Sequence, residues 1–302
     1  TYGAVCFNHM QALRFEKKED GRLTSVWLKD ALSGNEWKAN ATVFINATGP
    51  FADAIRQMAN QALRPRIRVS RGVHILLPKH VMNSHSALLI PQTRDGRVLF
   101  AIPYQKHLLV GTTDDETRLT ENEFGPTTAE VHYLLEYINE YLDVNAQPAQ
   151  VLAGFGGLRP LVMAESGNTK DLVRDHEVET DGASGLISIL GGKWTTYRLM
   201  AKDTIDTAEQ VLGKKITCTT ENITLTGSKT FDHSTAIQLQ QVSGWDHEVV
   251  KHLVSKYGDQ SLLIAEKLNS NPAGKDRLLP GMPYTLAELD YVLENEMAHT
   301  IK

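Results

Sequence analysis

The sequence contains few cysteines. Its 302 residues include only Cys6 and Cys218, which lie far apart and form neither a CxxC pair nor the Cys/His spacing of a zinc site. We therefore expect no disulfide framework and no metal. So few cysteines fit a reducing compartment, and the sequence predicts a cytoplasmic protein.

Long apolar runs and an excess of basic residues are also missing. Apolar runs such as residues 87–90 have the length of a strand, far below the roughly 20 residues of a membrane-spanning helix. The formal net charge is −5, which argues against a nucleic-acid-binding surface. An anionic ligand would therefore need a local cluster of Arg and Lys side chains.

Several well-known catalytic motifs do not occur. No G-x-G-x-x-G opens a strand–helix unit, and the glycine-rich residues 154–157 lead into Leu-Arg-Pro instead of a helix. There is no P-loop, no G-x-S-x-G and no H-E-x-x-H. The sequence gives no support to a kinase or a hydrolase.

What is present predicts an α+β protein. Residues 41–45 form a continuous apolar, β-branched run, which favours a strand buried on both faces. Residues 66–112 contain several short strands of antiparallel type, and Asp95-Gly96 is a strong hairpin signal. Residues 151–152 and 186–190 predict further strands.

Helices are marked by their caps and periodicity. Thr127 and Glu130 form a capping box before a helix that we expect to reach residue 142. After a polar linker at residues 219–229, the pattern becomes helical, and Thr285 with Glu288 starts the last helix, predicted over residues 285–301. We therefore predict an α+β body over residues 1–225 and a helical domain over residues 226–302.

Both ends of the chain lie inside structural patterns. Residues 2–7 are strand-like without any lead-in, and the chain stops in a helical pattern. We expect a fragment of a longer protein; the alternative is a complete small protein.

The strongest local signal is the segment from residue 186 to residue 198. A predicted strand runs into Gly191-Gly192, and a helix is expected from Thr195 or Thr196. A helix N-terminus carries unpaired N–H groups and partial positive charge, so it can hold an anion, and Lys193 adds a full charge there. The alternative is a tight turn in which Thr195 and Thr196 merely cap the helix.

Two arginines and one histidine are further candidates. Arg159 lies between apolar residues and before a proline, so it could hold a carboxylate or phosphate, or form a buried structural ion pair. Arg174 is a weaker case, because Asp175 beside it could neutralise it. His74 is predicted within a strand, where an imidazole can act as a base or simply be a hydrogen-bonded core residue.

Taken together, several segments resemble the FAD-dependent glycerol-3-phosphate dehydrogenases, a branch of the D-amino-acid-oxidase-like flavoproteins. They occur in the order of that family and cover nearly the whole chain. The most specific are Gly-Leu-Arg-Pro-Leu at 157–161 and Gly-Gly-Lys-Trp-Thr-Thr-Tyr-Arg at 191–198. The others are residues 46–53, 70–74, 97–104, 110–114 and the tail around residues 279–300.

The resemblance implies part of an FAD-binding fold, an antiparallel-sheet substrate domain and a small C-terminal helical domain. It also implies that sn-glycerol 3-phosphate is oxidised to dihydroxyacetone phosphate by hydride transfer from C2 to FAD. In that reaction His74 would be the base, Arg159 and Arg174 would hold the substrate, and Lys193 would stabilise charge on the flavin. The remaining cofactor contacts would be made by Ala47, Thr48, Gly49, Gly191, Gly192, Trp194, Thr195 and Thr196.

The same resemblance leaves alternatives open. The electrons could pass to quinone, which we expect, or to oxygen, as in a glycerophosphate oxidase. The G-x-G-x-x-G with which the family begins is not in this sequence, so we expect the isolated chain to be inactive. A non-catalytic module that binds phosphate or a protein partner is the main rival, and an amine or amino-acid oxidase ranks lower. Peripheral contact with the cytoplasmic face of the inner membrane and a homodimer are also left open.

Overall fold

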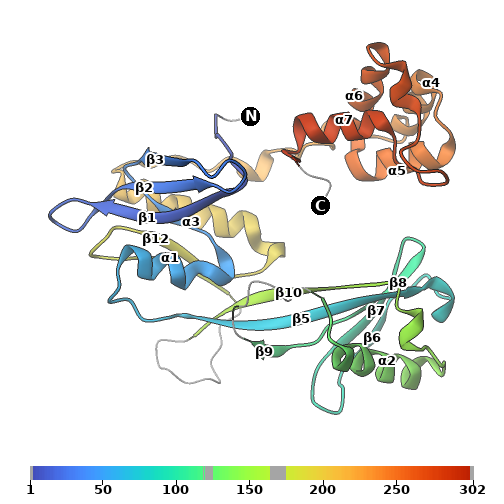
Figure 1. Ribbon diagram of the computed structural model, residues 1–302, viewed down its shortest axis with the longest axis horizontal. Helices are drawn as coiled ribbons and strands as arrows, with labels where there is room; N and C mark the ends of the chain where they lie inside the picture. The colour runs from blue at the N-terminus through green and yellow to red at the C-terminus, as the bar shows by residue number, and fades with distance from the viewer. Residues whose placement is uncertain (1–2, 118, 120–124, 164–174, 300–302) are drawn as a thin grey trace. The chain divides into compact units, whose positions relative to one another are not determined.

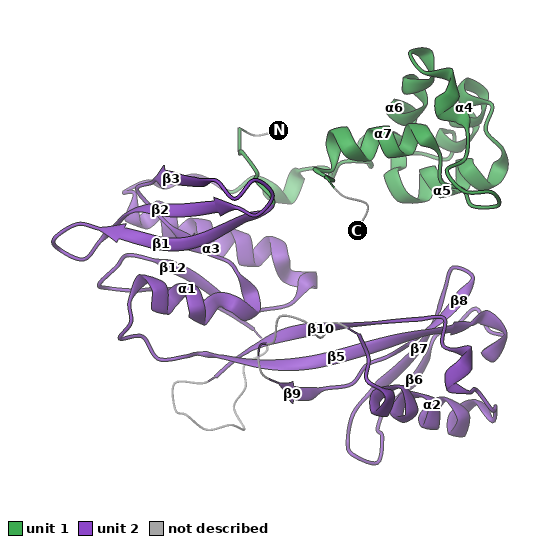
Figure 2. Cartoon of the chain, viewed as in Figure 1, with its two compact units in different colours: residues 1–8, 218–302 green, residues 9–217 purple. Residues whose placement is uncertain are grey.

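The computed structural model describes residues 3–117, 119, 125–163 and 175–299. The chain divides into two compact units, one of residues 9–217 and one of residues 1–8 with 218–302 (Figure 2). Each unit has its own hydrophobic core.

The larger unit contains a small antiparallel sheet and a larger one (Figure 1). The small sheet consists of β1 (Met10–Lys17), β2 (Leu23–Asp30) and β3 (Glu36–Asn40). The six-stranded sheet has the order β10-β5-β8-β7-β6, with β9 also paired to β5. Its strands are β5 (Ile67–Pro78), β6 (Leu88–Ile90), β7 (Leu99–Tyr104), β8 (His107–Gly111), β9 (Asp115–Thr117) and β10 (Ala153–Val162).

One face of the six-stranded sheet packs against helix α2 (Thr128–Leu142). Alternate residues of β5, namely Val73, Ile75 and Leu77, are fully buried in this core, together with Leu134 and Ile138 of α2. Because neighbouring residues of a strand point to opposite faces, the residues between them lie on the other face of the sheet. That face carries the candidate site.

A third sheet contains β11 (His176–Thr180), β12 (Ile187–Gly191) and the short β4 (Ile45–Asn46). β4 and β12 are parallel neighbours, so their carboxyl ends lie at the same edge. Helix α1 (Ala52–Ala59) follows β4, and α3 (Tyr197–Val211) follows β12. Each helix is preceded by a 3₁₀ turn: η1 (Gly49–Phe51) before α1 and η4 (Trp194–Thr196) before α3.

The smaller unit is helical. Its helices are α4 (Thr235–Ser243), α5 (His247–Tyr257), α6 (Ser261–Glu266) and α7 (Leu286–Asn295). They enclose a core that includes Leu239, Trp245, Leu253 and Ile264. The other 3₁₀ turns within the described residues of both units are η2 (Lys79–Val81), η3 (Pro148–Gln150), η5 (Thr220–Asn222), η6 (Gly258–Gln260), η7 (Lys267–Asn269) and η8 (Pro272–Lys275).

The predicted α+β class, with antiparallel sheets and a C-terminal helical region, is confirmed. The capping box also forms: the Thr127 N–H donates to Glu130 at 2.7 Å, and the Glu130 N–H donates to the Thr127 hydroxyl at 3.3 Å. Gly96 has φ +83° in the turn between β6 and β7, as the Asp-Gly signal predicts. Among the described residues, no helix combines the length and apolar character needed to cross a membrane.

Other element predictions were wrong. Residues 3–7 are not a strand. The strand predicted over residues 41–45, with both faces buried, is reduced to Ile45–Asn46. In the described sheet it pairs with β12 alone, and Ile45 is 41% exposed. The strand predicted at residues 151–152 instead begins at Ala153 and extends through the Gly-Leu-Arg-Pro motif. The last helix ends at Asn295, after which Met297 has φ +56°.

Candidate functional site

His74 lies in the middle of β5, on the sheet face opposite α2. It is paired with Gly111 of β8 on one side and with Phe155 of β10 on the other. Its ring stacks on Phe155, with centroids 5.1 Å apart and planes 13° apart. A side chain at Gly111 would collide with the imidazole. The ring is thus confined between an aromatic neighbour and a glycine.

The surroundings of His74 keep its imidazole neutral near pH 7. Burial disfavours the protonated ring, and the positive charge of Arg159 disfavours it further, so both lower the pKa of His74 below 6.5. A neutral imidazole can accept a proton from a hydroxyl group.

Arg159 extends from β10 on the same sheet face as His74. It is paired with Ser70 of β5, and its guanidinium lies over Gly72, where any side chain would overlap it. Nη2 donates to the Thr112 hydroxyl at 2.8 Å, and Nη1 donates to the Thr113 carbonyl at 3.1 Å.

The predicted structural alternative for Arg159 was a buried ion pair. The structure shows an ion pair with Asp114 at 3.3 Å, but the Arg159 side chain is 37% exposed and that of Asp114 is 52% exposed. The guanidinium is therefore held in place and still reachable from solvent, which is what a binding residue requires.

The turn after β4 is organised by a buried asparagine. The Asn46 amide donates to the Ala52 carbonyl at 3.0 Å and to the Ser188 hydroxyl of β12 at 3.2 Å. Its oxygen accepts from the Thr48 hydroxyl at 2.7 Å and from the Thr48 N–H at 3.3 Å. Gly49 follows with φ +57°. These bonds fold Ala47, Thr48 and Gly49 into a compact turn at the edge shared with β12.

The turn after β12 reaches the same edge. Gly191 and Gly192 have φ +69° and +90°, which glycine adopts readily. A side chain on Gly191 would lie 2.5 Å from Val162, and one on Gly192 would overlap Met200. The turn therefore needs glycine for both conformation and space, and it presents exposed Lys193 at the start of η4.

The predicted threonine caps are not formed. The Thr196 hydroxyl donates to the Lys193 carbonyl at 3.1 Å, and neither η4 nor α3 has a side-chain cap. Trp194 is 85% exposed and stacks on Tyr197. Trp194, Thr195 and Thr196 therefore lie at the surface beside the turn.

The two parts of the site meet at β10. The position of a side chain on Gly191 would be 3.8 Å from the carbonyl of Pro160, which follows Arg159. The structure thus brings the Gly191–Lys193 turn next to the strand that carries Arg159. Arg174 lies outside the described residues.

Sequence analysis did not predict the residues that contact and position the side chains of His74 and Arg159. Phe155, Gly72 and Gly111 acquire their roles only through the pairing of β5 with β8 and β10. The chain contains no local signal for that register. Thr112 and Asp114 belong to residues 110–114, one of the segments that carry the family resemblance, and the structure places both against Arg159.

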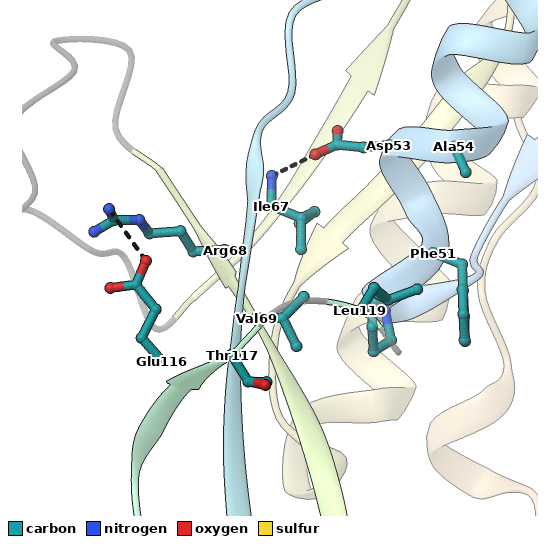
Figure 3. Close-up of a pocket in the computed structure, with 10 residues that line it drawn as sticks. Phe51, Asp53, Ala54, Ile67, Arg68, Val69, Glu116, Thr117 and Leu119 are labelled. Carbon is teal, nitrogen blue, oxygen red and sulfur yellow. Dashed lines mark hydrogen bonds and ion pairs between the residues drawn. The ribbon is translucent and has the colours of Figure 1, made fainter. Parts of the chain in front are cut away.

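A cavity of about 350 Å³ lies elsewhere in the larger unit, between η1, α1, β5 and β9 (Figure 3). Its polar groups are already occupied: Asp53 accepts from the N–H of Ile67 at 2.8 Å, and Arg68 pairs with Glu116 at 3.3 Å. None of its lining residues is His74, Arg159 or Lys193.

Comparison with known proteins identifies relatives over nearly the whole chain. Residues 1–198 match the family model described as FAD dependent oxidoreductase, and residues 218–302 match the C-terminal domain of alpha-glycerophosphate oxidase. A Caenorhabditis elegans protein named probable glycerol-3-phosphate dehydrogenase, mitochondrial, is 38% identical over 97% of this chain and 42% of its own length. The mitochondrial glycerol-3-phosphate dehydrogenase of Rattus norvegicus is 37% identical over 96% of this chain and 41% of its own.

A solved structure extends the likeness to three dimensions. The glycerol-3-phosphate dehydrogenase from Bacillus halodurans, complexed with FAD, matches with a TM-score of 0.85 and 27% identity, over 99% of this chain and 59% of that one. The chain spans about two fifths of the length of the two curated relatives. It belongs to the FAD-dependent oxidoreductase family, in the branch that contains the glycerol-3-phosphate dehydrogenases.

Proposed function

We propose that the full-length protein carrying this chain oxidises sn-glycerol 3-phosphate to dihydroxyacetone phosphate. The observation that carries this proposal is the placement of a neutral imidazole, His74, and an accessible guanidinium, Arg159, on one open sheet face. This pair suits a substrate that has both a hydroxyl group to deprotonate and an anionic group to bind. The names of the relatives agree with that substrate.

The residues present fit the family's FAD cofactor. Ala47, Thr48 and Gly49 share one sheet edge with Gly191 and Gly192. Both turns contain glycines at positive φ, and because glycine has no side chain a ligand can approach the backbone there. Lys193 brings a positive charge to that edge. Bound FAD supplies the acceptor for the hydride that leaves C2 of the substrate.

In this proposal His74 takes the proton of the C2 hydroxyl group. Its low pKa leaves the ring nitrogen free to accept that proton at neutral pH. Arg159 binds the substrate through charge-assisted hydrogen bonds, and Arg174 is proposed to share this role. Lys193 stabilises negative charge on the reduced cofactor. Gly191, Gly192, Trp194, Thr195 and Thr196 form the surface on which the cofactor rests.

The roles of the arginines can be tested in the full-length protein. We expect Arg159→Ala and Arg174→Ala each to raise the KM for glycerol 3-phosphate at least tenfold, measured by steady-state kinetics. Loss of a charge-assisted hydrogen bond costs about 1.5–3 kcal/mol, and a tenfold change corresponds to about 1.4 kcal/mol. An unchanged KM in both variants would rule out these roles.

Arg94→Ala is a matched control. Arg94 is also ion-paired, with Glu140 at 2.7 Å, but its side chain is 67% exposed and its partner lies on α2, which packs on the other face of the sheet from His74 and Arg159. We expect this variant to keep the KM of the unaltered protein.

The electron acceptor is proposed to be quinone, and a glycerophosphate oxidase using oxygen is the alternative. Measuring reduction of a soluble quinone analogue against production of hydrogen peroxide distinguishes them. The cytoplasmic location stays a prediction from the sequence, whereas the curated animal relatives are named as mitochondrial. Peripheral membrane contact and a homodimer also stay predictions.

A further inference from the structure

A histidine–carboxylate pair lies beside the Gly191–Lys193 turn. His176 is the first residue of β11, and Asp203 lies on α3. Nε2 of His176 is 2.8 Å from Oδ2 of Asp203. The His176 side chain is only 14% exposed, while that of Asp203 is 39% exposed.

The pair is connected to the turn through its backbone and its packing. His176 is the strand partner of Gly191, so the first residue of β11 and the first glycine of the turn are side by side. A side chain on Gly192 would lie 3.2 Å from Cβ of His176 and would overlap Met200, one turn before Asp203 on α3. Gly191 and Gly192 therefore lie between β11, which carries His176, and α3, which carries Asp203.

Such a turn needs support from its neighbours. Glycine has more backbone freedom than any other residue, so two consecutive glycines at positive φ do not hold one conformation by themselves. The hydrogen bond between His176 and Asp203 links the strand on one side of the turn to the helix that begins after it. This bond therefore restrains the turn that leads to Lys193 and η4.

We propose that His176 and Asp203 are positioning residues for FAD, which act by fixing the Gly191–Lys193 turn. The inference rests on the proposed role of this turn in binding the cofactor. Neither residue needs to touch the flavin, because each acts through the glycines. The bond can form with the imidazole as a neutral donor or as a cation.

The test is the dissociation constant of FAD, measured by fluorescence titration of the full-length apoprotein and its variants. His176→Ala and Asp203→Ala should each weaken FAD binding at least fivefold, and the double variant should be little worse than either, because one bond is lost in each case. His176→Gln keeps an N–H donor at the end of the side chain and should bind within twofold of the unaltered protein. Thermal unfolding of each variant shows whether the rest of the fold is kept.

A control comes from the same helix. Asp206 pairs with Lys202 at 2.6 Å on α3, three residues after Asp203, so Asp206→Ala removes a carboxylate without touching His176. It should leave the FAD affinity unchanged. If an alanine variant does not fold, Asp203→Leu keeps a side chain of similar size without a hydrogen-bond acceptor. A weakened affinity in that folded variant supports the inference.

Two results would overturn the inference. One is an FAD affinity within twofold of the unaltered protein in the folded variants, and the other is an equal loss in Asp206→Ala. Failure of the proposed function looks different, because in that case the unaltered protein itself would not oxidise glycerol 3-phosphate, whether or not it binds FAD.

Discussion

Gly72 and Gly111 each lie under a polar side chain of the candidate site. Gly72 leaves room for the guanidinium of Arg159, and Gly111 leaves room for the imidazole of His74. Neither glycine has a positive φ, so the requirement at these positions is space alone. Because these two residues lack a β-carbon, the guanidinium of Arg159 and the imidazole of His74 have room to lie against the sheet face.

We expect Gly111→Ala to displace the His74 ring. The added methyl group overlaps the imidazole, and overpacking of this kind costs about 1–3 kcal/mol. The variant should lower both the free energy of unfolding, measured in urea, and kcat of the full-length protein. Gly182→Ala is the control, because a β-carbon there has no neighbour within 4 Å. Equal behaviour of the two variants would contradict this account of Gly111.

The pH dependence of kcat/KM tests the state of His74. Its pKa is lowered by burial and by the charge of Arg159, so activity should fall only below the ordinary value of 6.5 as the ring becomes protonated. Removing a positive charge makes protonation easier and raises the pKa. In Arg159→Ala the acid limb of the profile should therefore move to higher pH, whereas in Arg94→Ala it should stay. An acid limb that stays at the same pH in Arg159→Ala would show that the charge of Arg159 does not lower the pKa of His74.

At the scale of elements, only one of the two hydrogen bonds of the capping box predicted for Thr285 and Glu288 is formed. Thr285 accepts a hydrogen bond from the Glu288 N–H at 3.2 Å, as a capping box predicts. The Glu288 carboxylate, however, is buried and accepts from His252 at 2.9 Å, Lys256 at 3.1 Å and Tyr257 at 2.8 Å. It joins α7 to α5 instead of completing the cap.

This carboxylate should make the helical unit sensitive to acid. Burial opposes its ionisation, but the hydrogen bonds from His252 and Tyr257 outweigh burial and lower the pKa of Glu288 below 4.5. A lowered pKa in the folded state means that its stabilisation is present above the unfolded value and is lost as the pH falls through the folded one. Glu288→Gln should therefore reduce stability at pH 7 and have less effect below about pH 4.5.

Amide hydrogen exchange in α5 and α7 measures this effect where it arises. At pH 7 we expect faster exchange in Glu288→Gln, equivalent to about 1.5–3 kcal/mol for hydrogen bonds to a charged group. Glu294→Gln, on the same helix but with a side chain 62% exposed, should exchange like the unaltered chain. Unchanged protection in Glu288→Gln would show that the carboxylate does not hold the two helices together.

Elements whose sequence signals lie in neighbouring residues were predicted well. Strands that depend on pairing with a strand distant in the sequence were not. The capping box before α2 and the Asp-Gly turn follow from neighbouring residues. β10 was missed because Gly-Gly-Leu-Arg-Pro is a poor strand sequence on its own. It forms as an edge strand, where Pro160 is tolerated, because β5 supplies its hydrogen-bonding partner.

At the scale of the whole molecule, the candidate cofactor edge is largely exposed. Trp194 is 85% exposed, and Ile45 of β4 is 41% exposed. The sequence has no G-x-G-x-x-G to bind the pyrophosphate of a dinucleotide. The described residues thus offer one wall of the proposed FAD site.

We therefore expect the 302-residue chain, expressed by itself, to purify without the yellow colour of flavin. The absorbance spectrum between 350 and 500 nm and the ratio of FAD to protein measure this directly, on the order of zero against one for the full-length protein. Stoichiometric bound FAD in the isolated chain would contradict this expectation and show that the chain binds the cofactor without a G-x-G-x-x-G motif.

The sequence by itself determined the family, the α+β class, the capping box before α2 and the Asp-Gly turn. These depend on motifs, caps and glycines, whose effects act between residues close together in the chain. Only the tertiary structure decided that Gly72, His74, Gly111 and Arg159 share one sheet face and that the turns after β4 and β12 share one edge. Strand pairing across long stretches of chain produces both arrangements, and the register of such pairs is set by the packing of the whole sheet.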